Sequence, residues 1–157
     1  MQEHHERDVM RRTGVSKGSA NKILRLLAEK GFLIRERKGR MVFYRLDTGD
    51  PAVRQFKVLV NVYALTGLID RIKERCRRII LFGSCAEGTD VRGSDIDLFV
   101  LTSEKGPVRG EIGRFNAGSE RRVAPIVVDA NEFVEMREED KPLYENVERG
   151  IVLWERE

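Results

Sequence analysis

Several residue types and patterns are scarce in this sequence, and each absence removes a class of protein. The 157 residues include only two cysteines, Cys76 and Cys85, too few for a disulfide framework or a cysteine-rich metal site. No apolar run approaches the roughly 18 residues of a membrane helix, and the charged N-terminal stretch lacks the apolar segment of a signal peptide. Low-complexity segments are also missing. These absences predict a folded protein of a reducing, cytoplasmic compartment, with no membrane association.

Charge is abundant but unevenly divided along the chain. Charged residues make up 35% of the sequence and hydrophobic residues 41%, which allows a packed core beneath a heavily charged surface. The first 50 residues carry 12 Lys and Arg against 7 Asp and Glu, whereas residues 51–157 carry 17 against 19. A turn-rich run, Asp47–Pro51, separates the two compositions. We therefore expect two domains, 1–48 and 49–157, of which the first faces a polyanion.

The N-terminal part has the pattern of helix, turn, helix and hairpin. A short helix over 6–12 is expected to end at Gly14, and Ser16 is a typical N-cap for a second helix. Residues 32–37 and 41–46 flank a basic tip and predict a β-hairpin. Four apolar residues of the second helix recur at helical spacing and are expected to face the core: Ala20, Ile23, Leu24 and Leu27.

The outward side of this second helix is polar and basic. Lys38 and Arg40, at the hairpin tip, can contact a DNA backbone or minor groove. Five helix side chains can donate to DNA phosphates or reach base edges in a major groove: Lys17, Ser19, Asn21, Lys22 and Arg25.

Residues 5–46 resemble winged helix-turn-helix transcription regulators, with most of the likeness in 13–27, although residues 1–5 are too few to supply the first helix of such domains. The resemblance implies binding to duplex DNA. Two alternatives stay open, a solvated charged face used for protein contacts and a homodimer through this head.

The longer C-terminal part alternates apolar runs with helical patterns. Residues 52–75 predict one or two helices, with Gly67 as a candidate break. Apolar residues of this stretch that fit a helix include Phe56, Leu59, Val60 and Tyr63. Strands are expected at 79–82, 95–101, 123–128 and 151–154, and helices at 108–115, 131–136 and 142–149. The predicted fold class is α+β, a winged helix followed by a mixed sheet with flanking helices.

Two short motifs in this part carry the chemistry. Gly83-Ser84 follows the first apolar strand, and Asp95-Ile96-Asp97 begins the next. Carboxylates at alternate strand positions lie on one face, about 6.6 Å apart along the chain, and repel each other unless a cation lies between them. Mg²⁺ is the cation that such oxygen ligands favour. A glycine turn followed by a serine and free backbone amides can bind an anion. The motifs together predict a site for Mg²⁺ and a nucleoside triphosphate, with catalysis by positioning and metal stabilisation of phosphoryl charge.

The spacing Gly-Ser-x(10)-Asp-x-Asp, with apolar strands on both sides, resembles the DNA polymerase beta-like nucleotidyltransferase superfamily and its minimal, MNT-type branch. The likeness covers about residues 56–155. It implies a nucleotidyltransferase-type mixed sheet, one or two Mg²⁺ ions, and transfer of a nucleoside monophosphate, with ATP as the expected donor. It further implies that Asp95 and Asp97 bind metal and act in catalysis, and that Gly83 and Ser84 bind the nucleotide.

MNT-type proteins often act as antitoxins that adenylylate a HEPN-type toxin, so the resemblance also makes a protein acceptor plausible. Two other functions stay open. One is a DNA-binding transcription regulator or antitoxin with a catalytically degenerate nucleotide pocket, and the other is a purely structural interaction protein.

Two positions depart from the superfamily pattern. A third carboxylate usually follows on the next strand, where this sequence has Ala124 or Pro125. Asp129, at the end of that strand, is the nearest candidate for a third catalytic carboxylate, or else caps the following helix. Where many relatives carry an arginine after the Gly-Ser, this chain has Glu87, and Arg92 is the candidate that compensates beside the phosphates.

Other polar residues are assigned no site role. His4 and His5 are expected in a loose N-terminal stretch, and Asp90 is expected to be a plain loop residue. Arg121 is expected at a solvated strand start, where it could add to a surface for polyanions.

Overall fold

The computed structural model describes residues 3–156 and divides the chain into two compact units, Met1–Gln55 and Phe56–Glu157. Both units combine helices with strands, so the fold is of the mixed α+β class. None of the helices within residues 3–156 is long and apolar enough to cross a membrane.

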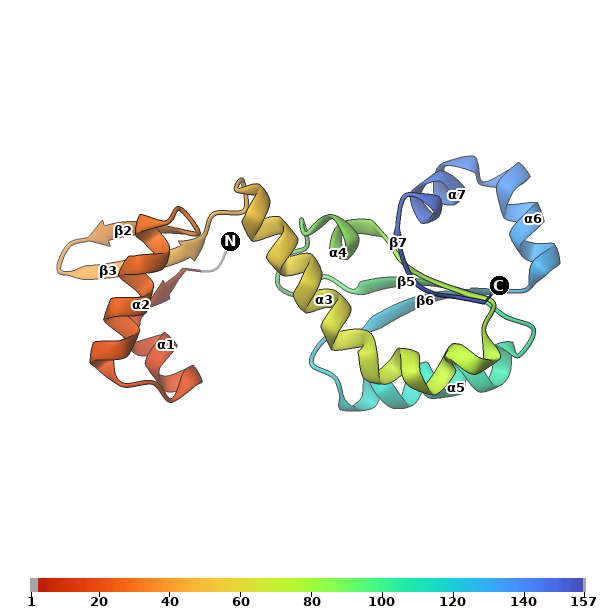
Figure 1. The fold of residues 1–157 in the computed structure, drawn as a ribbon, viewed down its shortest axis with the longest axis horizontal. Coiled ribbons are helices and arrows are strands. Elements are labelled where there is room, and N and C mark those ends of the chain that lie inside the picture. Colours follow the sequence, from red (N-terminus) through yellow and green to blue (C-terminus); the bar gives the residue numbers. More distant parts are fainter. Residues whose placement is uncertain (1–2, 157) are drawn as a thin grey trace. The chain divides into compact units, whose positions relative to one another are not determined.

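The N-terminal unit contains two helices and a three-stranded antiparallel sheet (Figure 1). Its strand order is β1-β3-β2. The elements follow the expected sequence of helix, turn, helix and hairpin, with one additional strand at the start. They are β1 (His4–His5), α1 (Glu6–Thr13), α2 (Lys17–Glu29), β2 (Leu33–Lys38) and β3 (Met41–Leu46).

The caps of this unit agree with the sequence, but its first strand does not. Gly14 ends α1 at a φ of 71°, and the Ser16 side chain accepts a hydrogen bond from the Ser19 amide at the start of α2. His4 and His5 were expected in a loose stretch. They pair instead with β3, and the His5 side chain caps α1. The backbone hydrogen bonds of β3 order a stretch whose side chains gave no strand signal.

The apolar stripe of α2 is only partly covered. Ala20 and Leu24 are buried, as expected, whereas Ile23 is 49% exposed and Leu27 is half-buried. Helix α2 packs against α1 and β2, which leaves its remaining apolar side facing solvent. The expectation that all four residues form one core stripe is therefore wrong for Ile23.

The C-terminal unit is a four-stranded mixed sheet with helices on both faces. Helix α3 (Pro51–Ile72) enters it from the first unit as one continuous helix that Gly67 does not interrupt, and a short 3-10 turn, η1 (Lys73–Arg75), follows. The remaining elements are β4 (Arg78–Leu81), α4 (Gly83–Glu87), β5 (Ile96–Leu101), α5 (Lys105–Gly118), β6 (Val123–Val128), α6 (Ala130–Glu139), α7 (Lys141–Glu148) and β7 (Ile151–Glu155).

The sheet has the strand order β6-β5-β4-β7. Strand β4 is antiparallel to both β5 and β7, and β5 is parallel to β6. Leu81, the last residue of β4, pairs with Leu98 near the start of β5. The antiparallel pairing therefore brings the turn after β4 next to the residues that open β5.

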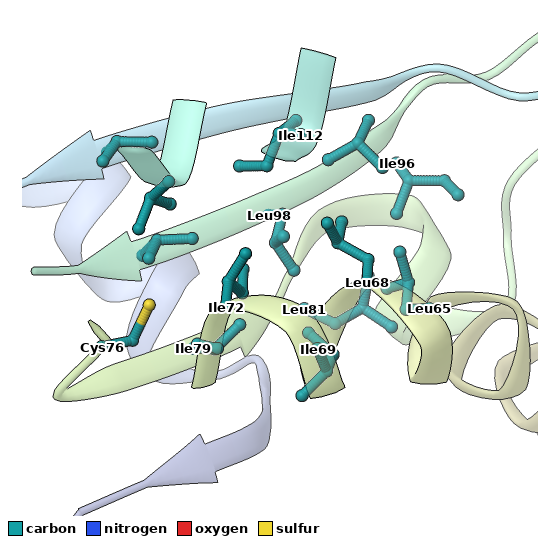
Figure 2. Close-up of a cluster of buried hydrophobic side chains, with 14 of the residues drawn as sticks. Leu65, Leu68, Ile69, Ile72, Cys76, Ile79, Leu81, Ile96, Leu98 and Ile112 are labelled. Carbon is teal, nitrogen blue, oxygen red and sulfur yellow. The ribbon is translucent and has the colours of Figure 1, made fainter. Parts of the chain in front are cut away.

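Two hydrophobic clusters hold the helices against the sheet. The larger cluster lies between the sheet and helices α3 and α5, with Leu68, Ile79, Leu98 and Ile112 among its fully buried side chains (Figure 2). The smaller one, centred on Phe99, packs against α6 and α7. Because side chains alternate along a strand, residue 97 belongs to the same face as Phe99, at the end of β5 where the strand begins.

Candidate active site

The two sequence motifs meet at the adjoining ends of β4 and β5. The Phe82 amide donates to the Asp97 carbonyl at 3.1 Å, and Gly83 follows with a φ of 66°. A Cβ atom on Gly83 would lie 2.6 Å from Oδ2 of Asp97. Glycine is thus required at position 83 for two reasons. The backbone is left-handed there, and the Asp97 carboxylate occupies the space that a side chain would need. The Gly-Ser turn and the second acid form one site.

The two acids interact with each other. Asp97 is half-buried and Asp95 is exposed. Burial raises the pKa of Asp97 above its usual range, and the nearby negative charge of Asp95 raises it further. Within residues 3–156, neither side chain forms an ion pair, so the repulsion is uncompensated inside the chain.

This donor set fits one divalent cation. Two carboxylates can hold a Mg²⁺ ion whose other positions are filled by water and phosphate oxygens. In the described part of the chain there is no cluster of three or more metal-ligating side chains. A second ion would therefore lack a further protein carboxylate.

The third carboxylate proposed from the sequence is at the wrong end of the strand. The register pairs Asp97 with Ala124, a residue without a ligand atom in its side chain. Asp129 follows Val128, which pairs with Leu101. Four residues of strand separate Asp97 from Leu101, about 13 Å at 3.3 Å per residue. Asp129 is therefore too distant to share an ion with Asp97, and its assignment as a catalytic residue is corrected.

Asp129 has a structural role at the opposite end of the sheet. Its Oδ1 accepts hydrogen bonds from the Asn131 and Glu132 amides, which caps α6, and Nζ of Lys105 donates to its Oδ2 at 2.8 Å. The Lys105 ammonium group and these amides lower the pKa of Asp129. A cavity of about 540 Å³ that Asp129 and Thr102 help to line also lies at this end, away from the acid pair.

Gly83 is also the first residue of the short helix α4. Its first turn has no side-chain cap, so backbone amides there are available to an anion. The Ser84 carbonyl accepts hydrogen bonds from the Thr89 and Asp90 amides, which folds the next loop back onto α4. Glu87 is exposed at the end of α4, and Arg92 lies in the exposed turn that leads to β5.

A buried polar network holds the loop between α4 and β5 in place. The Asp90 carboxylate is 8% exposed and interacts with two side chains of α3. Its Oδ1 forms an ion pair with Nζ of Lys57 at 3.3 Å and accepts a hydrogen bond from Nδ2 of Asn61 at 3.1 Å. Nη1 of Arg121 lies 3.4 Å from its other oxygen. Asn61 also donates to the Cys85 carbonyl at 3.0 Å. The loop that precedes the acid pair is thereby tied to α3 on one side and to the residues just before β6 on the other.

Sequence reasoning missed this network. Asp90 and Arg121 were assigned as loop and solvated residues, yet Arg121 also donates to Oδ1 of Asn61 at 2.7 Å and to the Cys85 sulfur at 3.0 Å. Burial raises the pKa of Cys85, so its thiol remains protonated. A usable signal was present in α3, where Lys57 and Asn61 stand one turn apart on the helix's inner side.

Replacing Gly83 with alanine is expected to destabilise the protein and weaken nucleotide binding. The left-handed backbone costs alanine about 1–2 kcal/mol, and the new methyl group displaces the Asp97 carboxylate. Gly93→Ala is the matched control, because Gly93 has a φ of 89° but no described atom within 4 Å of an added Cβ. Thermal unfolding with and without Mg²⁺ and ATP measures both effects. Equal losses in the two variants would contradict the contact with Asp97.

The residues proposed for DNA contact are not equally available. Lys17, Lys22 and Arg25 are exposed on α2, as are Ser19 on the same helix and Arg40 in the hairpin turn. Asn21 is half-buried and donates to the Glu6 carboxylate at 2.9 Å, so its amide is engaged within the unit.

At the hairpin tip, Lys38 forms an ion pair with Glu3 at 2.7 Å. Contact of these residues with DNA stays a prediction, in which Asn21 and Lys38 would have to exchange an internal partner for the DNA.

Comparison with known proteins identifies the C-terminal part. Residues 69–157, more than half of the chain, match the family described as Polymerase beta, Nucleotidyltransferase. No curated protein sequence matches the chain significantly.

Two crystal structures are similar to it. One is of a proposed nucleotidyltransferase from Sulfolobus solfataricus, with 19% identity, a TM-score of 0.46, and coverage of 69% of this chain and 92% of that one. The other is of a mutant of the toxin-antitoxin pair MntA-HpeT, with 22% identity, a TM-score of 0.43, and coverage of 61% and 74%.

Proposed function

Because the chain belongs to the Polymerase beta nucleotidyltransferase family, we propose that its C-terminal unit transfers a nucleoside monophosphate from a nucleoside triphosphate to an acceptor. The observation that carries the proposal is that the Asp97 carboxylate fills the space that a side chain on Gly83 would take. The Gly-Ser turn thus lies directly against Asp97, the half-buried member of an acid pair that has no ion-pair partner within residues 3–156. A purely structural sheet gains nothing from that arrangement, since the repulsion between Asp95 and Asp97 costs free energy.

Each residue of the site has a defined task in this proposal. Asp95 and Asp97 hold Mg²⁺, and the ion supplies charge neutralisation on the triphosphate when bound. Gly83 leaves room for the Asp97 carboxylate, and the Ser84 hydroxyl and the first amides of α4 donate hydrogen bonds to phosphate oxygens. Arg92 stays a prediction for an additional phosphate contact. Lys57, Asn61 and Asp90 act as positioning residues that hold the loop between the two motifs.

The transfer balances as a single displacement. An acceptor oxygen forms a bond to the α-phosphorus, the bond from that phosphorus to the bridging oxygen breaks, and pyrophosphate leaves. The proton of the acceptor passes to solvent, since Ala124 leaves no carboxylate opposite Asp97 to receive it. This arrangement predicts slow turnover, because general-base catalysis ordinarily contributes a factor of about 10² to 10⁴.

ATP as the donor, and a protein of the HEPN-type toxin class as the acceptor, remain predictions from the sequence resemblance. Incubating the protein with Mg²⁺ and ATP labelled at the α-phosphate, in cell extract, tests both. Compared with extract alone, addition of the protein is expected to increase labelling of a macromolecule with the α-label and not with the γ-label. An increase with the γ-label that depends on the added protein would indicate phosphoryl transfer and contradict the proposed reaction.

A second candidate function is a regulator that binds the nucleotide without transferring it. The register of β5 and β6 favours it, because Ala124 stands where the third carboxylate of the superfamily is expected. The two functions separate cleanly in experiment. Both predict that Mg²⁺ and ATP raise the melting temperature, and only the transferase predicts a labelled acceptor.

Duplex DNA binding by the N-terminal unit is a separate prediction. Lys17, Lys22 and Arg25 form the exposed basic side of α2, so affinity for DNA is expected to fall steeply with added salt. Replacing Lys22 and Arg25 together with glutamine should lower the slope of log K against log salt by about 2. Lys141→Gln, an exposed change in the C-terminal unit, is the control. Absence of binding at low salt would leave a protein-contact role for this unit.

A further inference from the structure

The backbone that leads into Asp95 is held by a single arginine. Asp95 lies one residue before β5, where the Ile96 amide donates to the Arg122 carbonyl at 2.8 Å. Nε and Nη2 of Arg121 both donate to the Ser94 carbonyl, at 3.4 and 3.3 Å. The guanidinium group therefore binds the peptide group that joins Ser94 to Asp95.

The carbonyl of Asp95 is reached through Cys85. Nη2 of Arg121 donates to the Cys85 sulfur at 3.0 Å, and the Cys85 thiol donates to the Asp95 carbonyl at 3.4 Å. Cys85 is fully buried, so its polar contacts are made within the protein. One guanidinium group thus contacts the peptide oxygen before Asp95 directly and the peptide oxygen after it through one sulfur atom.

Arg121 uses all three of its side-chain nitrogen atoms. Nη1 donates to Oδ1 of Asn61 at 2.7 Å and lies 3.4 Å from Oδ2 of Asp90. The side chain therefore connects α3, α4 and the turn before β5. Lysine carries the same charge on a single nitrogen atom, which suffices to pair with Asp90 but not to hold three elements together. Arginine at this position is accounted for by the contacts beside Asp95.

We propose that Arg121 is a positioning residue for Asp95 and sets where that carboxylate stands relative to Asp97. The inference rests on the proposed function, in which the two acids hold one Mg²⁺ ion. Asp97 is fixed independently, by its pairing with Ala124 within the sheet. Mg²⁺ requires nearly ideal octahedral geometry with bonds of about 2.0–2.1 Å, so a displacement of Asp95 takes its oxygen out of bonding range.

Arg121→Lys tests the proposal, because it keeps the positive charge beside Asp90 but lacks the fork that binds the Ser94 carbonyl. The probe is the Mn²⁺ complex of ATP, since Mn²⁺ accepts the same oxygen ligands as Mg²⁺. Its binding to the full chain is followed through the relaxation of water protons. The dissociation constant should rise about 10- to 100-fold, as is typical when a metal ligand loses its supporting contact. A constant unchanged from the native value overturns the proposal.

Asn116→Ala is the matched control for a loss of stability alone. Asn116 also holds the start of β6, because its Nδ2 donates to the Val123 carbonyl at 2.9 Å and its Oδ1 accepts from the Val123 amide at 2.8 Å. The variant should lower the melting temperature but leave the affinity for Mn²⁺-ATP unchanged. An equal loss of affinity in Asn116→Ala and Arg121→Lys would mean that Arg121 acts only through the stability of the fold, and would overturn the proposal.

A second pair of variants leaves Arg121 in place and keeps the proposal testable if Arg121→Lys does not fold. Cys85→Ala removes the link to the Asp95 carbonyl, whereas Cys85→Ser retains a donor and an acceptor there. The affinity for Mn²⁺-ATP should fall about three- to tenfold in Cys85→Ala, the effect of one hydrogen bond, and recover in Cys85→Ser. Native affinity in both variants would overturn the proposal.

Thiol alkylation tests the same contacts without any nucleotide. Arg121→Lys should expose Cys85 to alkylation, while Cys76, which is buried at the opposite end of the sheet, stays protected as an internal control. Unchanged protection of Cys85 would overturn the proposal. Failure of the proposed function gives a different result, because the native chain itself would then not bind Mn²⁺-ATP. If the native chain and Arg121→Lys bind it equally, only the role of Arg121 is wrong.

Discussion

Replacing Asp95 and Asp97 together with asparagine is expected to lower any transfer activity by at least about 100-fold, the loss that follows removal of one preorganised electrostatic contact. The amides retain the shape of the carboxylates but no longer offer two negative charges to Mg²⁺. The variant should also lose the stabilisation by Mg²⁺ and ATP, which for the native chain is about 2.7 kcal/mol at a ligand concentration 100-fold above the dissociation constant.

Without ligand, Asp97→Asn alone is expected to have the opposite effect and to stabilise the fold. Burial and Asp95 raise the pKa of Asp97 in the folded state, so its ionised form opposes folding. This unfavourable contribution is absent below the ordinary pKa of an aspartate and appears as the pH rises through the raised value. At pH 7, Asp97→Asn should therefore unfold at the same temperature as the native chain or higher, and the difference should vanish in acid.

A matched control separates the site from a simple change of net charge. Glu138→Gln with Glu139→Gln removes two exposed negative charges from α6 and should change neither activity nor the response to Mg²⁺ and ATP. If the native chain shows no thermal shift with Mg²⁺ and ATP, or if the Asp95 and Asp97 variant keeps that shift, the proposed nucleotide site is wrong.

Among the substitutions proposed for this protein, Asp90→Ala should lower the free energy of unfolding the most. The change leaves the Lys57 ammonium, 15% exposed, and the Arg121 guanidinium without their shared carboxylate. Breaking a buried ion pair by removing one partner costs about 3–5 kcal/mol. Denaturant unfolding can follow the loss through the fluorescence of Trp154, the single tryptophan, which packs against the core of the C-terminal unit.

Two further variants test whether the loss of stability in Asp90→Ala comes from the charges that it leaves unpaired. Adding Lys57→Met to Asp90→Ala should recover part of it by removing the stranded charge, with a coupling of about 0.5–3 kcal/mol. Glu145→Ala breaks an exposed ion pair in which the Lys141 side chain is 77% exposed and the Glu145 side chain 56% exposed. It should lower the free energy of unfolding by less than about 1 kcal/mol. An Asp90→Ala cost as small as that of Glu145→Ala would show that the network does not hold the loop.

Local signals in the sequence located most of the elements. Ser16 and Gly14 marked helix boundaries because cap residues act within one turn of backbone. The apolar runs at 79–82 and 123–128 marked buried strands, and the Gly-Ser and Asp-x-Asp motifs were found from spacing alone. The strand at His4 and His5 gave no signal of its own, because its order comes from hydrogen bonds to β3.

Sequence patterns were least reliable about which side of a helix is covered. Helical spacing in α2 and α3 correctly predicted helices, yet Ile23 of α2, which was expected to face the core, is exposed. Periodicity shows that apolar residues share a face, and the packing of neighbouring elements decides whether that face is buried.

The sequence by itself determined that a glycine turn and an acid pair lie ten residues apart, because that information resides in residue identity and order. Only the tertiary structure decided what they can bind. Strand register set Ala124 beside Asp97 and moved Asp129 to the far end of the sheet, and long-range packing buried Asp90 between Lys57 and Arg121. Register and burial depend on contacts between residues distant in the chain, which no local pattern records.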